Sequence, residues 1–436
     1  MPVRTIPGTE IKYWLLSFDA AGLERSDDPE GIVSQRLLEI AANEPITNIF
    51  LFSHGWRGDI GAAIAQYDSW IRAFMNQAED LKRASEKFPK FRPLLIGLHW
   101  PSEPWGEEEF GEGDSFAPSG AVSGEELIDS YLARIGDTPV TRQCLKVIIE
   151  EARANAAADT LPARAREAYL ALNEELGLGS AGPVAPPDAD RMEFDPDAAF
   201  DAANEESESF GTWHFGGILG PLRLLSYWTM KKRARSIGEG GMHTFLNQLQ
   251  AANQGARIHL MGHSFGCIVV SAMLGGPNGN APLERPVDSV ALIQGALSLW
   301  SYAAKIPFAK ISGYFSGILR DKKIKGPLIT TRSIHDNAVG VLYPLASWFY
   351  GSAAFAPESL PEYGAIGSYG IQGLSDSLPE VTVLSADDSY PFAKGRTTNL
   401  EASGVIIKKQ GLSGAHNDIA GPEIAHVLWA AALASM

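Results

Sequence analysis

A serine lies between two glycines in residues 256–273, which read ARIHLMGHSFGCIVVSAM. The pattern is Gly262-x-Ser264-x-Gly266, set between two apolar runs without a polar turn. A sharp turn from a strand into a helix would hold this serine in a strained conformation with its hydroxyl clear of the sheet, and the glycines would let strand and helix approach closely. We therefore predict that Ser264 is a nucleophile. A helix N-cap serine is the alternative, but it does not account for both glycines.

A serine hydroxyl is a weak nucleophile at neutral pH and needs a base that is itself oriented by a third group. Among nine histidines, His416 has the most suitable context, because it lies in a Gly-rich loop (GLSGAHNDIAG) just before a helix predicted to begin near Pro422. His99 and His259 fall in predicted strands, and His243 and His426 in helical stretches. We predict His416 as the base, against the alternative of a surface loop histidine.

The acid should lie between the serine and the histidine in chain order. Asp336, in PLITTRSIHDNAVG, follows a predicted strand and meets this requirement. It would hold the tautomer of His416 and stabilise the imidazolium that forms. Asp387 and Asp388, in VLSADDSYPF, are the rival pair, and an aspartate that only serves a turn is the remaining alternative.

Two backbone N–H groups are needed to stabilise an oxyanion. Phe265 follows the nucleophile at the start of a helix, so its N–H is the first candidate. The second comes from NIFLFSHGWRGD, where His54 and Gly55 end a clear strand and the N–H of Trp56 follows. We count His54 and Gly55, together with His263 next to the serine, as supporting positions.

Short apolar runs alternate with helical patterns over much of the chain, which predicts strands joined by helical crossovers in a mainly parallel sheet. Several runs are continuously apolar, as strands buried on both faces are. The predicted strands are 12–18, 48–54, 93–100, 257–262, 289–295, 327–333, and either 381–386 or 404–409.

The alternation stops between residues 105 and 240, where acidic loops at 104–114 and 188–208 accompany Ala-rich helical patterns. We predict a mainly helical insertion here, with 1–104 and 241–436 forming the core. Residues 211–235 combine apolar and aromatic side chains with a basic end. Peripheral contact with a membrane is one interpretation, and a crossover helix starting near Pro221 is the other.

The whole-chain totals exclude several classes of protein. A net charge of −16 over 436 residues disfavours nucleic acid as a partner. No apolar run is long enough for a transmembrane helix, and the N-terminus lacks a secretory pattern, so we expect a cytoplasmic protein. Cys144 and Cys267 are expected to stay unpaired. Neither a Walker phosphate loop nor zinc-ligand spacing occurs, so no metal is expected.

Five segments occur in a consistent order, each after a predicted strand: FSHGW, LHWPS, GHSFG, HDNAVG and GAHNDI. Over residues 12–104 and 241–436, the chain resembles the α/β-hydrolase superfamily. The resemblance implies a mostly parallel eight-stranded sheet with helices on both faces, a serine nucleophile, no cofactor, and hydrolysis through an acyl-enzyme. The long insertion and the aromatic stretch at 347–370 depart from the minimal pattern, so the resemblance leaves the substrate open.

These observations predict a serine hydrolase that acts on a carboxylic ester, similar to an esterase or lipase, with a small-molecule or lipid-like acyl substrate. Amidase, peptidase or thioesterase chemistry on the same residues is an alternative, and so is a non-catalytic interaction protein on a hydrolase scaffold. We expect the insertion to form a cap over Ser264, with Trp213 and Trp228 near an acyl pocket.

Overall fold

The protein divides into two compact units. The first comprises Met1–Ser102, Arg233–Tyr343 and Gly364–Met436, and the second comprises Glu103–Lys232 and Pro344–Tyr363. A computed structural model describes residues 2–27, 31–56, 60–88, 90–102, 124–155, 158–179, 182, 185–210, 217–342, 360–374, 380–383, 385–409 and 413–435, with the backbone alone at 124, 205–210 and 341–342. The acidic segment 104–114, Trp213 and most of the aromatic stretch 347–370 lie outside them. The sequence-based division differs, since it assigned 233–240 to the insertion and 344–363 to the core.

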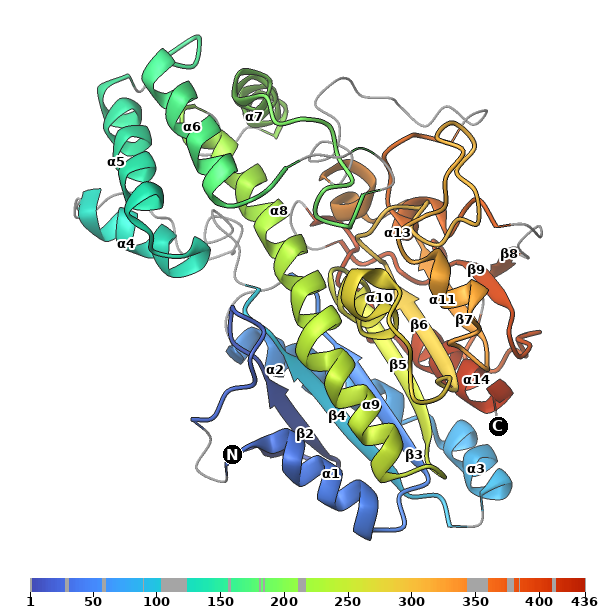
Figure 1. Cartoon of the computed structure of the whole chain (residues 1–436). Helices are drawn as coiled ribbons and strands as arrows, with labels where there is room; N and C mark the ends of the chain where they lie inside the picture. Colours follow the sequence, from blue (N-terminus) through green and yellow to red (C-terminus); the bar gives the residue numbers. More distant parts are fainter. Residues whose placement is uncertain are drawn as a thin grey trace. The chain divides into compact units, whose positions relative to one another are not determined.

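The first unit is built on a mostly parallel sheet, as the strand and helix alternation predicted (Figure 1). Nine strands are described in it, in the order β1-β2-β4-β3-β5-β6-β7-β9-β8. They are β1 (Val3–Thr5), β2 (Lys12–Ser17), β3 (Asn48–Ser53), β4 (Pro93–His99), β5 (Arg257–His263), β6 (Ser289–Ile293), β7 (Leu328–Arg332), β8 (Glu380–Thr382) and β9 (Thr397–Glu401). Only the β1–β2 pair is antiparallel.

The expected number of eight strands is therefore wrong. Of the two alternatives for the last predicted strand, 381–386 overlaps β8, whereas 404–409 is not a strand. β9, which pairs with β7 and β8, reads TTNLE and has too little apolar character to be recognised. Its Asn399 is nevertheless buried, because the side-chain amide accepts from the N–H of Ile371 and donates to its carbonyl oxygen. The apolar run at 404–409 instead begins with turns, in which Val405 and Ile406 donate to the carbonyl oxygen of Ala402.

Strand register decides which residues meet at the carboxyl edge of the sheet. Ser53 of β3 pairs with Gly262 of β5, and His263 pairs with Ile293 of β6. The segments that follow these three strands therefore start side by side. β3 is buried along its whole length, as is expected for a central strand covered on both faces.

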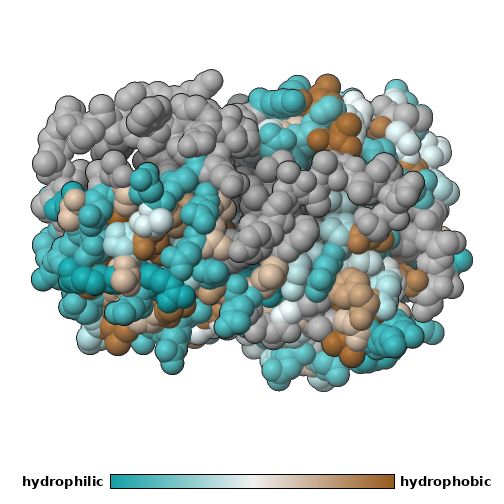
Figure 2. Space-filling model, turned by 90° about the horizontal axis from the view of Figure 1, so that it is seen from above, coloured by the Kyte–Doolittle hydropathy of each residue, from teal (hydrophilic) through white to brown (hydrophobic). Residues whose placement is uncertain are grey.

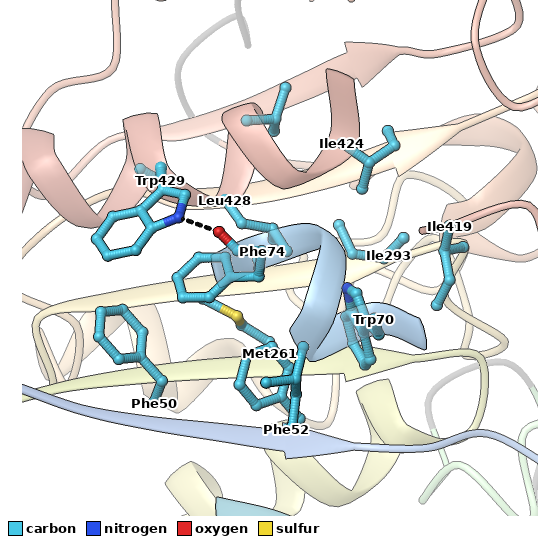
Figure 3. Close-up of a cluster of buried hydrophobic side chains, with 14 of the residues drawn as sticks. Phe50, Phe52, Trp70, Phe74, Met261, Ile293, Ile419, Ile424, Leu428 and Trp429 are labelled. Atoms are coloured by element: carbon cyan, nitrogen blue, oxygen red, sulfur yellow. Dashed lines mark hydrogen bonds between the residues drawn. The ribbon is translucent and has the colours of Figure 1, made fainter. Parts of the chain in front are cut away.

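Helices cover both faces of this sheet (Figure 1). On one face lie α2 (Ile60–Met75), α3 (Ala78–Lys87) and α14 (Pro422–Ser435); on the other lie α1 (Val33–Asn43), α9 (His243–Ala252) and α10 (Gly266–Gly275). Figure 3 shows the core beneath α2 and α14, where aromatic and aliphatic side chains from both helices meet those of the strands. Phe74 and Trp429 stack with ring centroids 4.4 Å apart, and Trp429 Nε1 donates to the carbonyl oxygen of Phe74 over 2.7 Å.

Short helical segments complete the first unit: η2 (Gly238–Met242), η3 (Pro277–Gly279), α11 (Ser316–Arg320), η4 (Ala338–Leu342) and α13 (Ile366–Tyr369). The second unit contains α4 (Gly124–Ile135), α5 (Pro139–Ala154), α6 (Ala163–Glu175) and α7 (Pro196–Phe210). α8 (Gly220–Ile237) begins in the second unit and ends in the first. Thr138 caps α5 by accepting from the N–H of Thr141, with Pro139 in the first turn.

Buried polar pairs hold the second unit together around α8. The guanidinium of Arg191 lies 3.4 Å from the centroid of the Trp228 ring, and burial lowers the pKa of Arg191 to about 10. Lys231 forms a buried ion pair with Asp190 over 2.7 Å. Trp228 also contacts Phe194 and is almost fully buried. The described part of 211–235, residues 217–235, thus lies mainly in α8, which starts near Pro221. Its Trp228 packs inside the second unit.

The described residues give no sign of a membrane-spanning segment, since none of their helices combines the length and apolarity needed. On the face drawn in Figure 2, hydrophilic residues predominate and apolar ones are scattered among them. Cys144 and Cys267 are both free, as the sequence predicted, and both are buried.

His426 of α14 joins three segments of the first unit through both ring nitrogens. Nδ1 lies 2.6 Å from a carboxylate oxygen of Asp80, and Nε2 lies 2.6 Å from the carbonyl oxygen of Asp388. A carboxylate and a carbonyl oxygen can only accept, so the imidazolium form, in which both ring nitrogens donate, satisfies both neighbours. Burial of the ring opposes its charge, but these hydrogen bonds outweigh burial and raise the pKa of His426 above 6.5.

The folded state should therefore gain stability from His426 at low pH and lose it as the pH rises through this raised pKa. We predict that His426→Leu lowers the free energy of unfolding by about 1.5–3 kcal/mol at pH 6 and by clearly less at pH 9. Urea denaturation at both pH values measures this. His335→Leu, at a histidine with no described side-chain bond, serves as the control. An equal loss at both pH values in His426→Leu would show that the ring is not charged.

Candidate active site

Ser264 lies in the turn between β5 and α10 with a φ of 55°, a left-handed conformation that a serine rarely adopts. Three backbone hydrogen bonds hold the turn: Ser264 N–H donates to the carbonyl oxygen of Ile293, and its own carbonyl accepts from Cys267 and Ala296. Bonds to the end of β6 and the segment after it on one side, and to α10 on the other, thus hold Ser264 in its strained conformation. This arrangement matches the strand, turn and helix in which nucleophilic serines are held.

Three glycines allow the backbone to close around this serine. A Cβ on Gly266 would overlap the carbonyl oxygen of Ser53, and one on Gly262 would lie 2.6 Å from the carbonyl oxygen of Gly266. A Cβ on Gly55 would lie 2.5 Å from the Cβ of Ser264 and 3.1 Å from its hydroxyl oxygen. Any larger residue would therefore displace one of these segments.

His416 and Asp336 form a buried pair, with Nδ1 of the histidine 2.7 Å from Oδ2 of the carboxylate. Their loops are tied together, because the N–H of Ala415 donates to the carbonyl oxygen of His335 and Asp336 forms a β-bridge with Gly414. Gly414 has a φ of 62°, which glycine adopts without strain. The other oxygen of Asp336 accepts from the N–H of Val339.

The rival acids Asp387 and Asp388 do not contact His416 through any described hydrogen bond. Asp387 is exposed, and its N–H donates to the hydroxyl of Ser385. Asp388 offers its carbonyl oxygen to His426 instead. The structure thus brings Asp336, and not the rival pair, to the histidine.

Gln294 is a residue of this site that the sequence analysis missed. Its Nε2 donates over 2.7 Å to the Oδ2 of Asp336, the oxygen that also faces His416. Thr331 of β7 fixes the amide, since its hydroxyl donates to Oε1 of Gln294 and accepts from the Gln294 N–H. Gln294 is fully buried with a φ of 47°. The only signal in the sequence is one polar residue at the end of the apolar run SVALIQG.

His263 connects the serine turn to the histidine loop. Its Nδ1 lies 2.9 Å from the amide nitrogen of Gln66 and must accept, so Nε2 carries the proton and donates to the carbonyl oxygen of His416 over 2.8 Å. The two imidazole rings lie with centroids 4.8 Å apart. Because His263 directly precedes Ser264, this bond keeps the His416 loop next to the serine.

Among the described residues, neither the Ser264 hydroxyl nor the Nε2 of His416 has a hydrogen-bond partner. The only described bond of the His416 ring runs from Nδ1 to Asp336. Hydrogen bonds between catalytic groups are often long without substrate and shorten when it binds. Both atoms are therefore available to a ligand or to one another.

His54 shapes the loop after β3. Its Nε2 accepts from the Trp100 N–H over 3.2 Å, so Nδ1 carries the proton and donates to the carbonyl oxygen of Gly55 over 2.7 Å. Burial, and then the nearby His99, lower the pKa of His54 to about 3, so the ring is neutral at physiological pH. The hydroxyl of Tyr67 donates to the Leu98 carbonyl oxygen and accepts from the N–H of His54. His54 thus has a structural role, and it fixes Gly55 against Ser264.

Trp56 and Phe265, the two predicted oxyanion donors, are neighbours in this site. Their aromatic rings have centroids 5.7 Å apart. Phe265 stands at the N-terminus of α10, where backbone N–H groups and the helix dipole favour negative charge. Both residues thus lie beside the serine turn, and donation by their N–H groups stays a prediction.

Comparisons of the chain with protein-family models, curated proteins and solved structures found no match. The described residues include no group of three or more His, Cys, Asp or Glu side chains that could hold a metal ion. The interpretation of this site therefore rests on its own geometry.

Removing the Gln294 amide should leave the buried Asp336 without one of its donors. We predict that Gln294→Leu lowers the free energy of unfolding by about 1–3 kcal/mol, the cost of an unsatisfied buried polar group. Urea denaturation measures this, with Gln35→Leu, at an exposed glutamine of α1, as the control.

A double-mutant cycle with Asp336→Asn separates the bond from general packing. The coupling energy between positions 294 and 336 should exceed about 0.5 kcal/mol. Strictly additive losses would contradict a direct interaction between the two side chains.

Proposed function

We propose that the protein is a serine hydrolase of the α/β-hydrolase superfamily that cleaves a carboxylic ester through an acyl-enzyme. The observation that carries the proposal is the Ser264 turn, strained and enclosed by glycine contacts, beside a buried pair of His416 and Asp336. A helix-capping serine needs neither this conformation nor such neighbours.

In the first step, Ser264 Oγ attacks the acyl carbon while Nε2 of His416 takes the hydroxyl proton. The tetrahedral intermediate then expels the alcohol, which receives this proton from His416, and an ester between Ser264 and the acyl group remains. In the second step, a water molecule gives a proton to His416 and attacks the acyl carbon. Collapse of that intermediate releases the acid and returns the proton to Ser264.

Asp336 is well placed to support these proton transfers. Its contact with Nδ1 of His416 leaves Nε2 unprotonated in the resting tautomer and stabilises the imidazolium afterwards. Donation from Gln294 to one oxygen and from the Val339 N–H to the other holds the carboxylate in position. We assign oxyanion stabilisation to the N–H groups of Phe265 and Trp56, because fixed backbone donors lower the cost of the developing negative charge.

The substrate we propose is an uncharged small-molecule or lipid-like ester. The net charge of −16 disfavours anionic substrates that must approach the protein. A cap over Ser264 from residues 105–240, expected from the sequence, stays a proposal. Trp228 is a weak candidate for an acyl pocket, because Arg191 and Phe194 already cover its ring.

Amide, peptide or thioester cleavage would use the same groups in the same steps, and it is the second candidate. Leaving-group preference depends on the shape of the pocket around the serine. A panel of esters and amides of increasing acyl length separates these chemistries. A non-catalytic role is disfavoured because the serine, histidine and acid are all present and buried together.

We predict that a fluorophosphonate probe labels the wild-type protein and that Ser264→Ala abolishes labelling, because the nucleophilic oxygen is lost. His416→Ala should lower kcat/KM for a p-nitrophenyl acyl ester by a factor on the order of 10²–10⁴, the usual contribution of general acid and base catalysis. Mass spectrometry and a colorimetric assay measure the two effects.

The matched controls are Ser85→Ala, at an exposed serine of α3, and His335→Ala, next to Asp336 in the chain. Both should retain labelling and ester turnover. Labelling that survives Ser264→Ala would refute the assignment of the nucleophile, and unchanged turnover in His416→Ala would refute that of the base.

A further inference from the structure

A large cavity lies at the amino edge of the sheet, away from the candidate active site. Its volume is about 1650 Å³, and its walls include Pro286 before β6, Gly326 before β7 and Arg396 before β9. Ser264, Asp336 and His416 all follow the carboxyl ends of strands. The five residues of β7 separate the two edges by roughly 17 Å, at 3.3 Å per residue.

The charge of this cavity is opposite to that of the chain. The whole chain has 52 acidic and 36 basic residues. Among the described lining residues, five are basic and none is acidic; the basic ones are Arg320, Lys322, Lys325, Lys394 and Arg396. A concave surface lined by one sign of charge concentrates the electrostatic field and attracts ions of the other sign.

The loop at 321–325 carries two of these lysines, Lys322 and Lys325, and is anchored by a third, buried lysine. Lys323 points inward, where its Nζ donates to the carbonyl oxygens of Leu274 (3.1 Å), Gly275 (3.2 Å) and Ala281 (2.6 Å). The flanking Lys322 and Lys325 are exposed, and Lys322 has a φ of 51°. Anchoring by the buried lysine thus holds the loop backbone that carries Lys322 and Lys325 at the cavity wall.

The loop before β9 adds Lys394 and is bound to the loop before β7. Gly395 N–H donates to the carbonyl oxygen of Gly326, and Leu328 N–H donates to that of Arg396, both over 2.9 Å. These bonds hold the two basic loops together.

Three of the cations are available for a ligand. Within the described chain, Lys322, Lys325 and Lys394 have no ion-pair partner. Arg320 differs, since it pairs with Asp321 and also donates to Asn280.

We propose that this cavity binds a small molecule that carries two or more phosphate groups. Several fixed lysines neutralise a multiply charged phosphate well, because each is a compact point charge with three donors. The volume exceeds the roughly 300–1000 Å³ of ordinary ligand pockets, so there is room for more than an inorganic ion. The basic side chains converge on one concave surface from two neighbouring loops, which suits a compact ligand better than an extended acidic peptide.

The test uses inorganic tripolyphosphate as the probe, with the full-length protein and isothermal titration calorimetry at about 50 mM salt, where screening is weak. The triple variant Lys322→Gln, Lys325→Gln, Lys394→Gln should bind the probe about tenfold or more weakly than wild type. The matched control is Lys82→Gln, Lys90→Gln, Lys409→Gln, which removes three exposed lysines that do not line the cavity. It should bind the probe as wild type does.

Fluorophosphonate labelling of Ser264 in both triple variants keeps this test separate from the proposed catalysis. Saturable binding by wild type and control, lost in the cavity variant, supports the proposal. Equal weakening in both triple variants would mean a general effect of net charge and would overturn it. Absence of binding to wild type, or binding of a Glu-rich peptide in place of the phosphate, would overturn it as well.

Discussion

The close contact between α10 and β3 is the constraint on which the candidate site depends. Gly266 approaches the carbonyl oxygen of Ser53 so closely that no side chain fits between them. Because the helix must start at this point, the chain turns sharply after β5, and Ser264 is forced to a φ of 55°. The same approach brings Gly55 against the serine, so the predicted oxyanion loop and the predicted nucleophile are positioned by one packing contact.

A chain of hydrogen bonds also holds the loops of the candidate site in place. It runs from Thr331 of β7 through Gln294 to Asp336 and His416, and then through His263 to Gln66 of α2. Each member bonds to the next, so the chain of bonds connects β7 to α2 through the loops that carry Asp336 and His416. The acid and the histidine are therefore held by strands and a helix, although both lie in loops.

The sequence predicted the features that have local causes and missed those with distant ones. Glycines flanking a serine between apolar runs indicate a tight turn by themselves, and continuous apolar runs marked β3, β5 and β6 closely. β9 was missed because its burial rests on Asn399 bonding to the backbone of Ile371, a contact between segments that no local pattern encodes. Gln294 was missed for the same reason, since its partners are 37 and 42 residues away.

The parallel sheet also explains why the first unit can hold two candidate sites, a basic cavity at the amino edge and the serine site at the carboxyl edge. The strands from β3 to β9 are parallel, so all of them start at the amino edge, where the basic loops precede β7 and β9, and end at the edge that carries the Ser264 turn. The strands between the edges are buried, and their backbone groups are bonded to one another. The basic loops are instead held by their own bonds, to the end of α10 and between Gly326 and Gly395. The lysines proposed to bind the ligand are exposed at the amino edge and take no part in these bonds, so we expect their replacement to leave the strained serine at the other edge unchanged.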